Sequence, residues 1–445
     1  MIILKLYDII YVVVKFNFKN LHIAIASLFL SFVLFSCGTT DIKNDEPVNE
    51  APVEIEQQEH LEQLTSEEQK ITETAEQLQT DDNQTETDNN TLSLLFAGDI
   101  MAHSVNYEIS DYPKIWRDVK YFIEPCDLAF ANIEAPIDDT RKPHTYPNFN
   151  MPQAYIEAAI DAGFDVFSLC NNHTNDQGLG GIKETVKTTE RLIERSKERG
   201  ENIYFSGLKD GKKADLTYNV IEKNGWKILF LPITEILNQP SHSEYINYIE
   251  NTDAARNAFA KKVTELRQKN PCDLFVISIH AYEVEYSRTI PDSREEYYMQ
   301  LLDAGADIVW SNHAHIIKDR KYIFYHETNS QKVIMFANGN TISGQRTKPE
   351  LTSTNPIGER DNTGDGLMVK LTFKKQDNGN PPTLINSENF FITTYINTAN
   401  EYVVKPLNQD FIDYLWEVPR SNWAKYIKRR IEINKKYTKD YILWQ

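Results

Sequence analysis

The stretch DAGFDVFSLCNNH, residues 161–173, returns later in the chain as DAGADIVWSNHAH, residues 303–315. In each copy a helical segment ends at a glycine, a short apolar strand follows, and Asn and His residues come next. The glycines, Gly163 and Gly305, suit the left-handed position that follows a helix. Ligands of open α/β sheets bind beyond the carboxyl ends of the strands. The two copies therefore predict that their polar residues converge on one site.

The same alternation of apolar runs and amphipathic segments begins at Thr91 and predicts an α/β fold. Strands are expected at residues 91–97, 128–131, 166–169, 228–231, 274–279, 308–310 and 332–336. Helices are expected at residues 154–162, 180–199, 252–269 and 293–304. Two further strands, 366–373 and 389–395, are expected to close the domain after a surface loop at 350–362.

Polar side chains follow five of the predicted strands. They are Asp99, Asn132 with Glu134, Asn172 with His173, His280, and His313 with His315. A lone histidine at a strand end is more often a hydrogen-bonded core or surface residue than a ligand. Five coincident strand ends favour a single site instead.

Imidazole and carboxylate ligands together favour Zn, Mn or Fe over Ca or Mg. The set holds more ligands than one tetrahedral ion takes, and two metal ions sharing a carboxylate would use them all. Such a pair lowers the pKa of a bridging water and stabilises a charged transition state. Hydrolysis of a phosphoester or of an amide both fit this chemistry. No GxSxG motif and no Walker loop competes with it.

The N-terminus reads as a secretion signal. Lys15 and Lys19 precede the apolar run LHIAIASLFLSFVLFS, residues 21–36, and Cys37 follows it. This arrangement resembles the lipobox of bacterial lipoproteins, which implies cleavage before Cys37 and its lipidation. An uncleaved membrane anchor is the alternative, although 16 apolar residues are short for a hydrocarbon core of about 30 Å. Residues 1–15 lengthen the signal, and a misplaced start codon or a first anchoring helix would explain them.

Residues 38–90 hold 16 Asp and Glu but only two Lys, and so account for most of the net charge of −18. They contain few residues able to form a core, which predicts a disordered, extended spacer between membrane and domain. A short helix around residues 54–79 and an acidic interaction arm are the alternatives. The charge therefore says little about the substrate, and no basic patch supports nucleic-acid binding.

Several motifs resemble the CapA family of capsule and poly-γ-glutamate synthesis proteins, within the calcineurin-like metallophosphatase superfamily. GDIM at residues 98–101, NIE at 132–134 and SLCNNHTNDQG at 168–178 are similar to its GDIM, NLE and SLANNHxxDxG motifs. DAGAD at 303–307 with HAH at 313–315, and NGN at 338–340, stand where the family has DAGAD, HPH and SLGNF. The likeness runs from about residue 92 to residue 344 with order and spacing preserved.

The resemblance implies a four-layer α/β/β/α sandwich with a di-metal site. By analogy Asp99 binds one metal and Glu134 bridges both. Asn172, His280 and His313 bind the second, and His315 returns to the first. His173 is implied as the general acid, oriented by Asp176. His103 and Asn132 are further candidates for metal or substrate binding, His103 as a displaced first-motif ligand.

Three motifs depart from the family pattern. HWGxEY reads HAYEVEY at residues 280–286, HPH reads HAH, and SLGNF reads FANGNT at 336–341. The inferred ligands survive these changes, but the substrate wall differs, which places a poly-γ-glutamate role in question for this chain.

The expected organisation is a signal peptide (1–37), an acidic linker (38–90), the metallophosphatase-like domain (91–397) and a C-terminal helical extension (398–445). From Gln409 the extension reads as an amphipathic helix packed on the domain, with membrane-surface contact as the alternative. Two functions fit this organisation. The first is a lipid-anchored, extracytoplasmic metal-dependent hydrolase acting on an anionic polymer or a phosphoester. The second is a non-catalytic assembly protein that works with capsule-synthesis membrane proteins in export of the polymer.

Overall fold

The computed structural model describes residues 90–209, 211, 215–346, 349, 351, 359–377 and 379–437. Contacts divide the chain into two units, Met1–Glu86 and Thr87–Gln445, and the description below concerns the second. The predicted signal peptide, Cys37 and nearly the whole acidic linker lie outside the described residues. Among the residues that are described, no helix combines the length and apolarity needed to cross a bilayer.

The first of two sheets has eight strands, in the order β14-β13-β12-β1-β2-β3-β4, with β11 also paired to β1. Its strands are β1 (Thr91–Ile100), β2 (Leu128–Ile133), β3 (Val166–Ser168), β4 (Tyr204–Ser206), β11 (Asn340–Ile342), β12 (Asp365–Lys374), β13 (Thr383–Ile396) and β14 (Tyr402–Pro406). Strands β1 to β4 run parallel, whereas β12, β13 and β14 form an antiparallel extension.

The second sheet has the order β5-β6-β7-β8-β10-β9, with its four central strands parallel. Its strands are β5 (Asn219–Lys223), β6 (Trp226–Thr234), β7 (Leu274–His280), β8 (Ile308–Asn312), β9 (Arg320–Tyr325) and β10 (Ser330–Met335). The parallel strands β6, β7 and β8 are mostly apolar because both faces of the sheet are covered.

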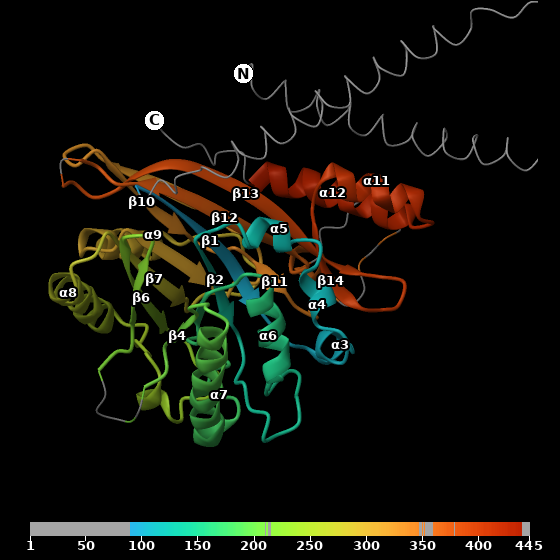
Figure 1. Cartoon of the computed structure of the whole chain (residues 1–445), viewed down its shortest axis with the longest axis horizontal. Coiled ribbons are helices and arrows are strands. Elements are labelled where there is room, and N and C mark those ends of the chain that lie inside the picture. Colours follow the sequence, from blue (N-terminus) through green and yellow to red (C-terminus); the bar gives the residue numbers. More distant parts are fainter. Residues whose placement is uncertain are drawn as a thin grey trace, which may run out of the picture. The chain divides into compact units, whose positions relative to one another are not determined.

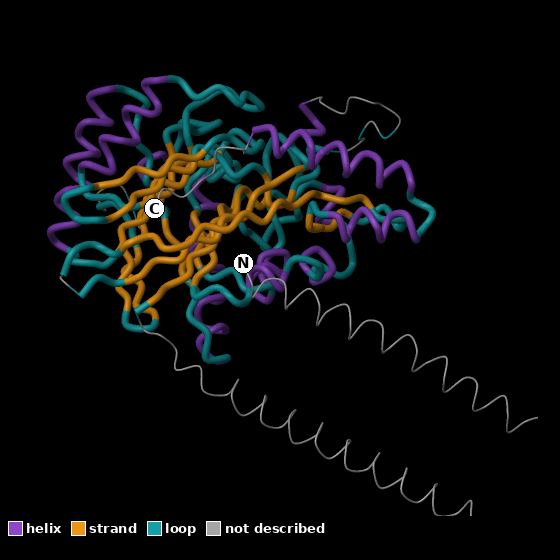
Figure 2. The backbone as a smooth tube through the Cα atoms, turned by 90° about the horizontal axis from the view of Figure 1, so that it is seen from above, coloured by secondary structure: helices purple, strands orange, loops and turns teal. Residues whose placement is uncertain are grey.

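Helices cover the outer face of each sheet, and the strands lie between them (Figures 1 and 2). The main helices are α6 (Gln153–Asp161), α7 (Gly178–Glu198), α8 (Asp253–Lys269) and α9 (Asp292–Asp303). The short helices are α3 (Ser104–Tyr107), α4 (Pro113–Trp116), α5 (Lys120–Ile123) and α10 (Glu359–Asn362), with the 3₁₀ turn η2 (Ser243–Tyr245).

Three apolar clusters separate these layers. One joins the first sheet to α4, α6 and α7, and another joins the second sheet to α8 and α9. The third lies between the two sheets, where Phe130 stacks on Phe96 and meets Phe230 of the opposite sheet edge-on. The fold is therefore the predicted four-layer α/β/β/α sandwich.

The C-terminal segment differs from the predicted single helix. It begins with β14 and continues as two helices, α11 (Gln409–Glu417) and α12 (Ser421–Tyr437). Pro419 stands between the helices, where it prevents a continuous helix. Both helices bury aromatic residues against β13 and β14, including Phe411, Trp423 and Tyr426. Packing on the domain is thus confirmed for the described part of this segment.

The expected loop at residues 350–362 ends in helix α10, which the sequence pattern did not indicate. The predicted positions of the other elements agree with the structure to within a few residues at most ends. Gly163 and Gly305 have φ of +107° and +122°, as expected for residues that follow a helix.

Candidate metal centre

The candidate ligands lie where the parallel strands of both sheets end. Asp99 stands near the end of β1, and Glu134 directly follows β2. His280 is the last residue of β7, and His313 directly follows β8. Two hydrogen bonds hold these strands together across the sandwich. Trp310 Nε1 of β8 donates to the carbonyl of Ala97 at 2.8 Å, and Asn338 Nδ2 donates to the same carbonyl at 3.2 Å.

The backbone at Asp99 depends on a close approach of two segments. The Asp99 amide donates to the carbonyl of Gly339 at 3.1 Å, and strand pairing is irregular just before Asp99. A Cβ atom on Gly98 would lie 1.8 Å from that same carbonyl oxygen. Only glycine fits here, which is the physical reason for the Gly-Asp pair in the sequence.

His313 and His315 reach the centre through unusual backbone conformations. Their φ angles are +105° and +57°, in the left-handed region that side-chain-bearing residues rarely adopt. Ala314 lies between them and accepts a hydrogen bond from the Tyr286 amide at 3.0 Å. Both histidines are buried.

In the part of the chain that the structure describes, three groups of side chains have ligand atoms within 4.8 Å of one another. These groups are Glu134 with His280 and His313; Asp99 with Glu134 and His315; and Glu285 with His313 and His315. Glu134 belongs to the first two groups, which makes it the shared carboxylate that the sequence analysis expected. The structure therefore brings five of the six predicted metal ligands into these groups.

Asn172, the sixth predicted ligand, lies beside them. Its Oδ1 is 2.9 Å from His280 Nε2, which is also 3.0 Å from His313 Nδ1. Asn132 donates from Nδ2 to Asp99 Oδ1 at 2.8 Å, so it orients that carboxylate. All six predicted ligands and Asn132 thus form one buried cluster.

Glu134 is a buried carboxylate whose charge no hydrogen bond from the described part of the chain balances. It is fully buried, and neither carboxylate oxygen has a hydrogen-bond partner among the described residues. Its nearest basic neighbours, His280 Nε2 and His315 Nε2, lie 3.6 and 3.7 Å from Oε1. Burial, followed by the charge of Asp99, raises the pKa of Glu134 well above its usual value. A carboxylate in this setting requires a proton or a cation.

The histidines of the site differ in the direction in which their surroundings shift the pKa. Burial, reinforced by the neighbouring imidazoles, lowers the pKa of His313 to about 3 and that of His280 well below its usual value. Both are therefore neutral at pH 7, the form that binds metal. Burial also lowers the pKa of His315, but its contacts with Asp99 outweigh burial, and the pKa rises overall. His315 Nδ1 lies 3.3 Å from Asp99 Oδ2.

His173 and Asp176 form a hydrogen-bonded pair at the edge of this cluster. His173 Nδ1 lies 2.7 Å from Asp176 Oδ2, which also accepts the Phe149 amide at 2.7 Å. The Phe149 ring packs edge-on against the imidazole. A carboxylate at Nδ1 leaves Nε2 to exchange a proton, as a general acid requires.

His103 belongs to none of the metal-ligand groups among the described residues. Its Nδ1 accepts a hydrogen bond from the Gly344 amide at 3.0 Å, and its ring packs edge-on against Phe149. Burial, with the charges of His315 and His173 as the next causes, lowers its pKa to about 3. His103 is therefore neutral at pH 7 and is hydrogen-bonded to Gly344 beside the candidate metal centre.

Three residues of the site were not predicted. Glu285 is the carboxylate of the third ligand group. Asn340 Oδ1 lies 3.0 Å from His315 Nδ1, and Asn238 donates its backbone amide to the Asn172 carbonyl. Asn340 stands in the NGN motif, and Glu285 in the altered HAYEVEY motif, so both lay within segments that the sequence marked.

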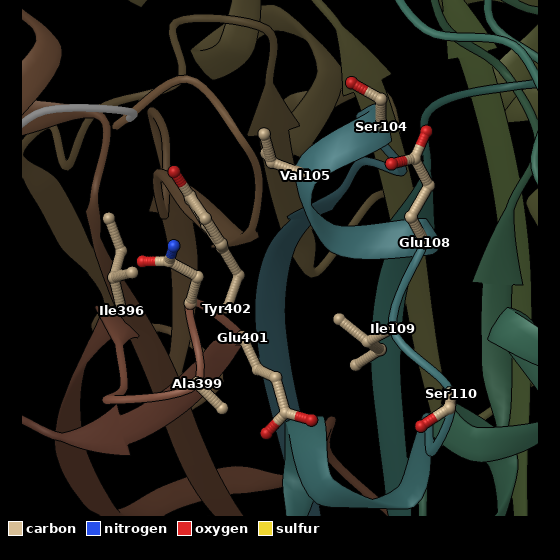
Figure 3. Close-up of a pocket in the computed structure, with 10 residues that line it drawn as sticks. Ser104, Val105, Glu108, Ile109, Ser110, Ile396, Ala399, Glu401 and Tyr402 are labelled. Carbon is tan, nitrogen blue, oxygen red and sulfur yellow. The ribbon is translucent and has the colours of Figure 1, made fainter.

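A separate hollow of about 610 Å³ lies between α3 and the turn before β14 (Figure 3). Val105 and Glu108 form one side, and Glu401 and Tyr402 the other. Glu401 is paired with Lys114 at 3.2 Å. None of the residues that line this hollow belongs to a metal-ligand group.

Comparison of the sequence with known proteins shows the family of the chain. The sequence profile of the bacterial capsule synthesis protein family PGA_cap matches residues 93–345. The chain belongs to this family. It is 26% identical over 271 residues to the capsule biosynthesis protein CapA of Bacillus anthracis, covering 58% of this chain and 61% of that protein. It is 24% identical over 265 residues to the PGA biosynthesis protein CapA of Bacillus subtilis (strain 168), covering 57% and 64%. The match therefore spans about three fifths of each relative.

Solved structures show weaker likenesses. A hypothetical protein from Thermus thermophilus has a TM-score of 0.36 and 15% identity, covering 67% of this chain and 98% of that one. The calcineurin-like phosphoesterase YfkN from Bacillus subtilis has a TM-score of 0.38 and 10% identity, covering 76% and 99%.

Proposed function

We propose that this capsule synthesis family member is a membrane-anchored, metal-dependent hydrolase that acts on an extracellular anionic polymer or a phosphoester. The observation that carries the proposal is the buried Glu134, which has two oxygens without hydrogen-bond partners and lies between two groups of histidine and carboxylate ligands. Its surroundings suit a pair of cations better than an uncompensated charge.

The donor set fits divalent transition metals such as Mn, Zn or Fe. Asp99, Glu134 and His315 would hold one ion. Glu134, His280 and His313, with the nearby Asn172 oxygen, would hold the other. A pair of such ions, when bound, supplies Lewis acidity that lowers the pKa of a water molecule and stabilises transition-state charge.

The protein's own groups supply the rest of the chemistry. Asn132 keeps the Asp99 carboxylate oriented, and Asn340 contacts the imidazole of His315. His173, held through Nδ1 by Asp176, donates a proton from Nε2 to the leaving group. Burial of the ligands excludes bulk water and strengthens these interactions.

The proposed class of substrate is supported by the family and by one arginine side chain near the centre. The matching relatives are named for capsule or PGA biosynthesis, which favours an anionic polymer. Arg360 donates from Nη1 to the Gln345 carbonyl at 3.2 Å, and Gln345 contacts both Asn340 and Tyr286 beside the centre. An exposed guanidinium there would attract a carboxylate or phosphate of the substrate.

Anchoring through Cys37 is part of the proposal and rests on the sequence of residues 15–37. A Cys37→Ser variant should lose lipid label and leave the membrane fraction. Retention of both by the variant would show that Cys37 is not the anchor.

Turnover is tested with the full-length protein, loaded with Mn²⁺ or Zn²⁺ and given phosphodiesters and poly-γ-glutamate. His173→Ala should lower kcat by about 10²- to 10⁴-fold without changing metal content, because it removes a proton donor and no ligand. His144→Ala is the matched control, since His144 is an exposed histidine outside the ligand groups. It should match the unaltered protein.

The alternative is a non-catalytic assembly protein that retains the metals. The loss of the Trp-Gly pair after His280, relative to the family motif, favours it. Metal binding without turnover of any substrate in the panel, unchanged by His173→Ala, would support this alternative over the hydrolase.

A further inference from the structure

Glu285 is the one carboxylate of the three ligand groups that has no assigned role. One of its oxygens lies within 4.8 Å of a ring nitrogen of His313 and of a ring nitrogen of His315. The residue is half-buried, whereas Asp99 and Glu134 are fully buried. Glu285 therefore approaches the centre from its more open side.

The segment that carries Glu285, residues 281–289, is fixed on the side that precedes it. The buried carboxylate of Glu235 pairs with Arg256 at 2.8 Å and with Arg294, and it accepts the Tyr282 amide at 3.2 Å. Arg294 also donates to the Tyr282 carbonyl at 2.6 Å. These contacts hold the chain just after His280.

The following side of the segment is fixed as well. Tyr286 has φ of +62°, and its amide donates to the Ala314 carbonyl between the two site histidines. Gln345 Nε2 lies 3.4 Å from the Tyr286 hydroxyl. The backbone directly after Glu285 is therefore tied to the loop that carries His313 and His315.

Glu283, two residues earlier, provides a useful contrast. Its carboxylate pairs with Lys318 at 2.6 Å, and so its charge is balanced by a cation of the protein. Among the described residues, no Lys or Arg forms an ion pair with Glu285. Its charge instead acts on Tyr286, whose pKa is raised by burial and then by Glu285.

We propose that Glu285 is a further metal ligand, a second carboxylate shared by the two halves of the centre. The three ligand groups share members. Glu134 belongs both to the group with His280 and His313 and to the group with Asp99 and His315, and Glu285 is grouped with His313 and His315. The ion that Glu285 helps to bind is a divalent transition metal ion, because the donors are a mixture of imidazoles and carboxylates. This inference rests on the proposed metal pair.

Two residues besides the six predicted ligands, His103 and Glu285, are candidates for an additional ligand. His103, the sequence candidate, uses Nδ1 to accept the Gly344 amide and lies in none of the ligand groups. Glu285 lies in one of them. The additional ligand is therefore the glutamate of the altered HAYEVEY motif.

The test compares Glu285→Gln with Glu283→Gln in the full-length protein, with Mn²⁺ as the probe. Calorimetric titration gives the number of ions bound and the dissociation constant of each. Glu285→Gln keeps the shape of the side chain but removes its charge. It should raise the dissociation constant of one of the two ions by about 10-fold or more. Glu283→Gln, on the same segment, should leave both constants within about two-fold.

Two further measurements separate ligation from a structural role. The midpoint temperature of thermal unfolding of the metal-free protein should be no lower for Glu285→Gln than for the unaltered protein, because no ion pair of the protein is lost. Electron paramagnetic resonance of the Mn²⁺-loaded protein should show a changed coupling between the two ions, which Glu285→Asp partly restores. Wild-type binding constants and an unchanged spectrum in Glu285→Gln would overturn the proposal. A wild-type protein that binds no Mn²⁺ would instead overturn the proposed metal centre itself.

Discussion

His313 and His315 adopt backbone conformations that cost free energy in a residue with a side chain, of order 1–3 kcal/mol each. The spacing of these histidines indicated a shared site, because residues beyond strand ends meet at one edge of a sheet. It could not show the left-handed turns that direct both rings inward. It also could not show that His103 accepts the Gly344 amide, because that contact joins segments far apart in the chain.

His103 makes stability depend on pH. Its pKa is about 3 in the folded protein and 6.5 in an exposed histidine. The unfolded chain therefore binds a proton that the folded protein does not, and stability falls as the pH drops from about 6.5 towards 3. For metal-free protein taken from pH 7.5 to 5, this one group lowers the free energy of unfolding by about 2 kcal/mol.

His103→Gln should remove that part of the loss, as measured by denaturant unfolding at the two pH values. Its free energy of unfolding at pH 7.5 serves as its own reference. An unchanged pH dependence in His103→Gln would show that His103 titrates normally in the folded protein.

At the scale of elements, most strands of the parallel core and the antiparallel strands β12 and β13 were predictable, whereas β4, β5, β9, β11 and β14 were not. Continuous apolar runs marked β1, β2, β7 and β8, because strands covered on both faces carry apolar residues throughout. β9 is mostly half-buried and β14 is only five residues long, so neither carries a continuous apolar run. The C-terminal helices showed their apolar spacing, but the buried polar contacts that fix α12 depend on residues of β12.

Asp365 of β12 attaches α12 to the first sheet. It is buried and accepts hydrogen bonds from Arg430 Nε at 2.6 Å, Asn434 Nδ2 at 2.8 Å and Arg346 Nη2. Although burial raises its pKa, the charges of Arg430 and Arg346 outweigh burial and hold the pKa below the usual value. Asp365→Asn removes the carboxylate charge that pairs with two buried guanidinium groups.

This substitution should lower the free energy of unfolding by about 3–5 kcal/mol at pH 7. Because the folded pKa is depressed, the contribution is present above pH 3.8 and is lost as the pH falls further. Chemical denaturation at pH 7 measures the effect, with Asp410→Asn, an exposed carboxylate of α11, as the control. A change below about 1 kcal/mol would show that α12 is held by its apolar face alone.

For the whole molecule, the family, the four-layer sandwich and the clustering of the six ligands were all accessible from the sequence. The motifs occur in order, and each follows an apolar strand, so chain order and sheet topology together place them at one edge. Glu285 was not accessible, because its place depends on how residues 281–289 fold back over the loop of His313 and His315. The contacts that hold that segment come from Glu235, Arg294 and Gln345, which lie on three different parts of the chain.

The central claim is that the buried carboxylates and histidines hold a pair of transition metal ions. Elemental analysis of the full-length protein, purified without chelator and then equilibrated with Mn²⁺ or Zn²⁺, tests it most directly. We expect about two ions per chain, and at most one in the double variant His280→Ala, His313→Ala, which retains the Asp99, Glu134 and His315 group. Protein without bound transition metal, or metal content unchanged in the double variant, would show that these side chains do not hold a metal pair.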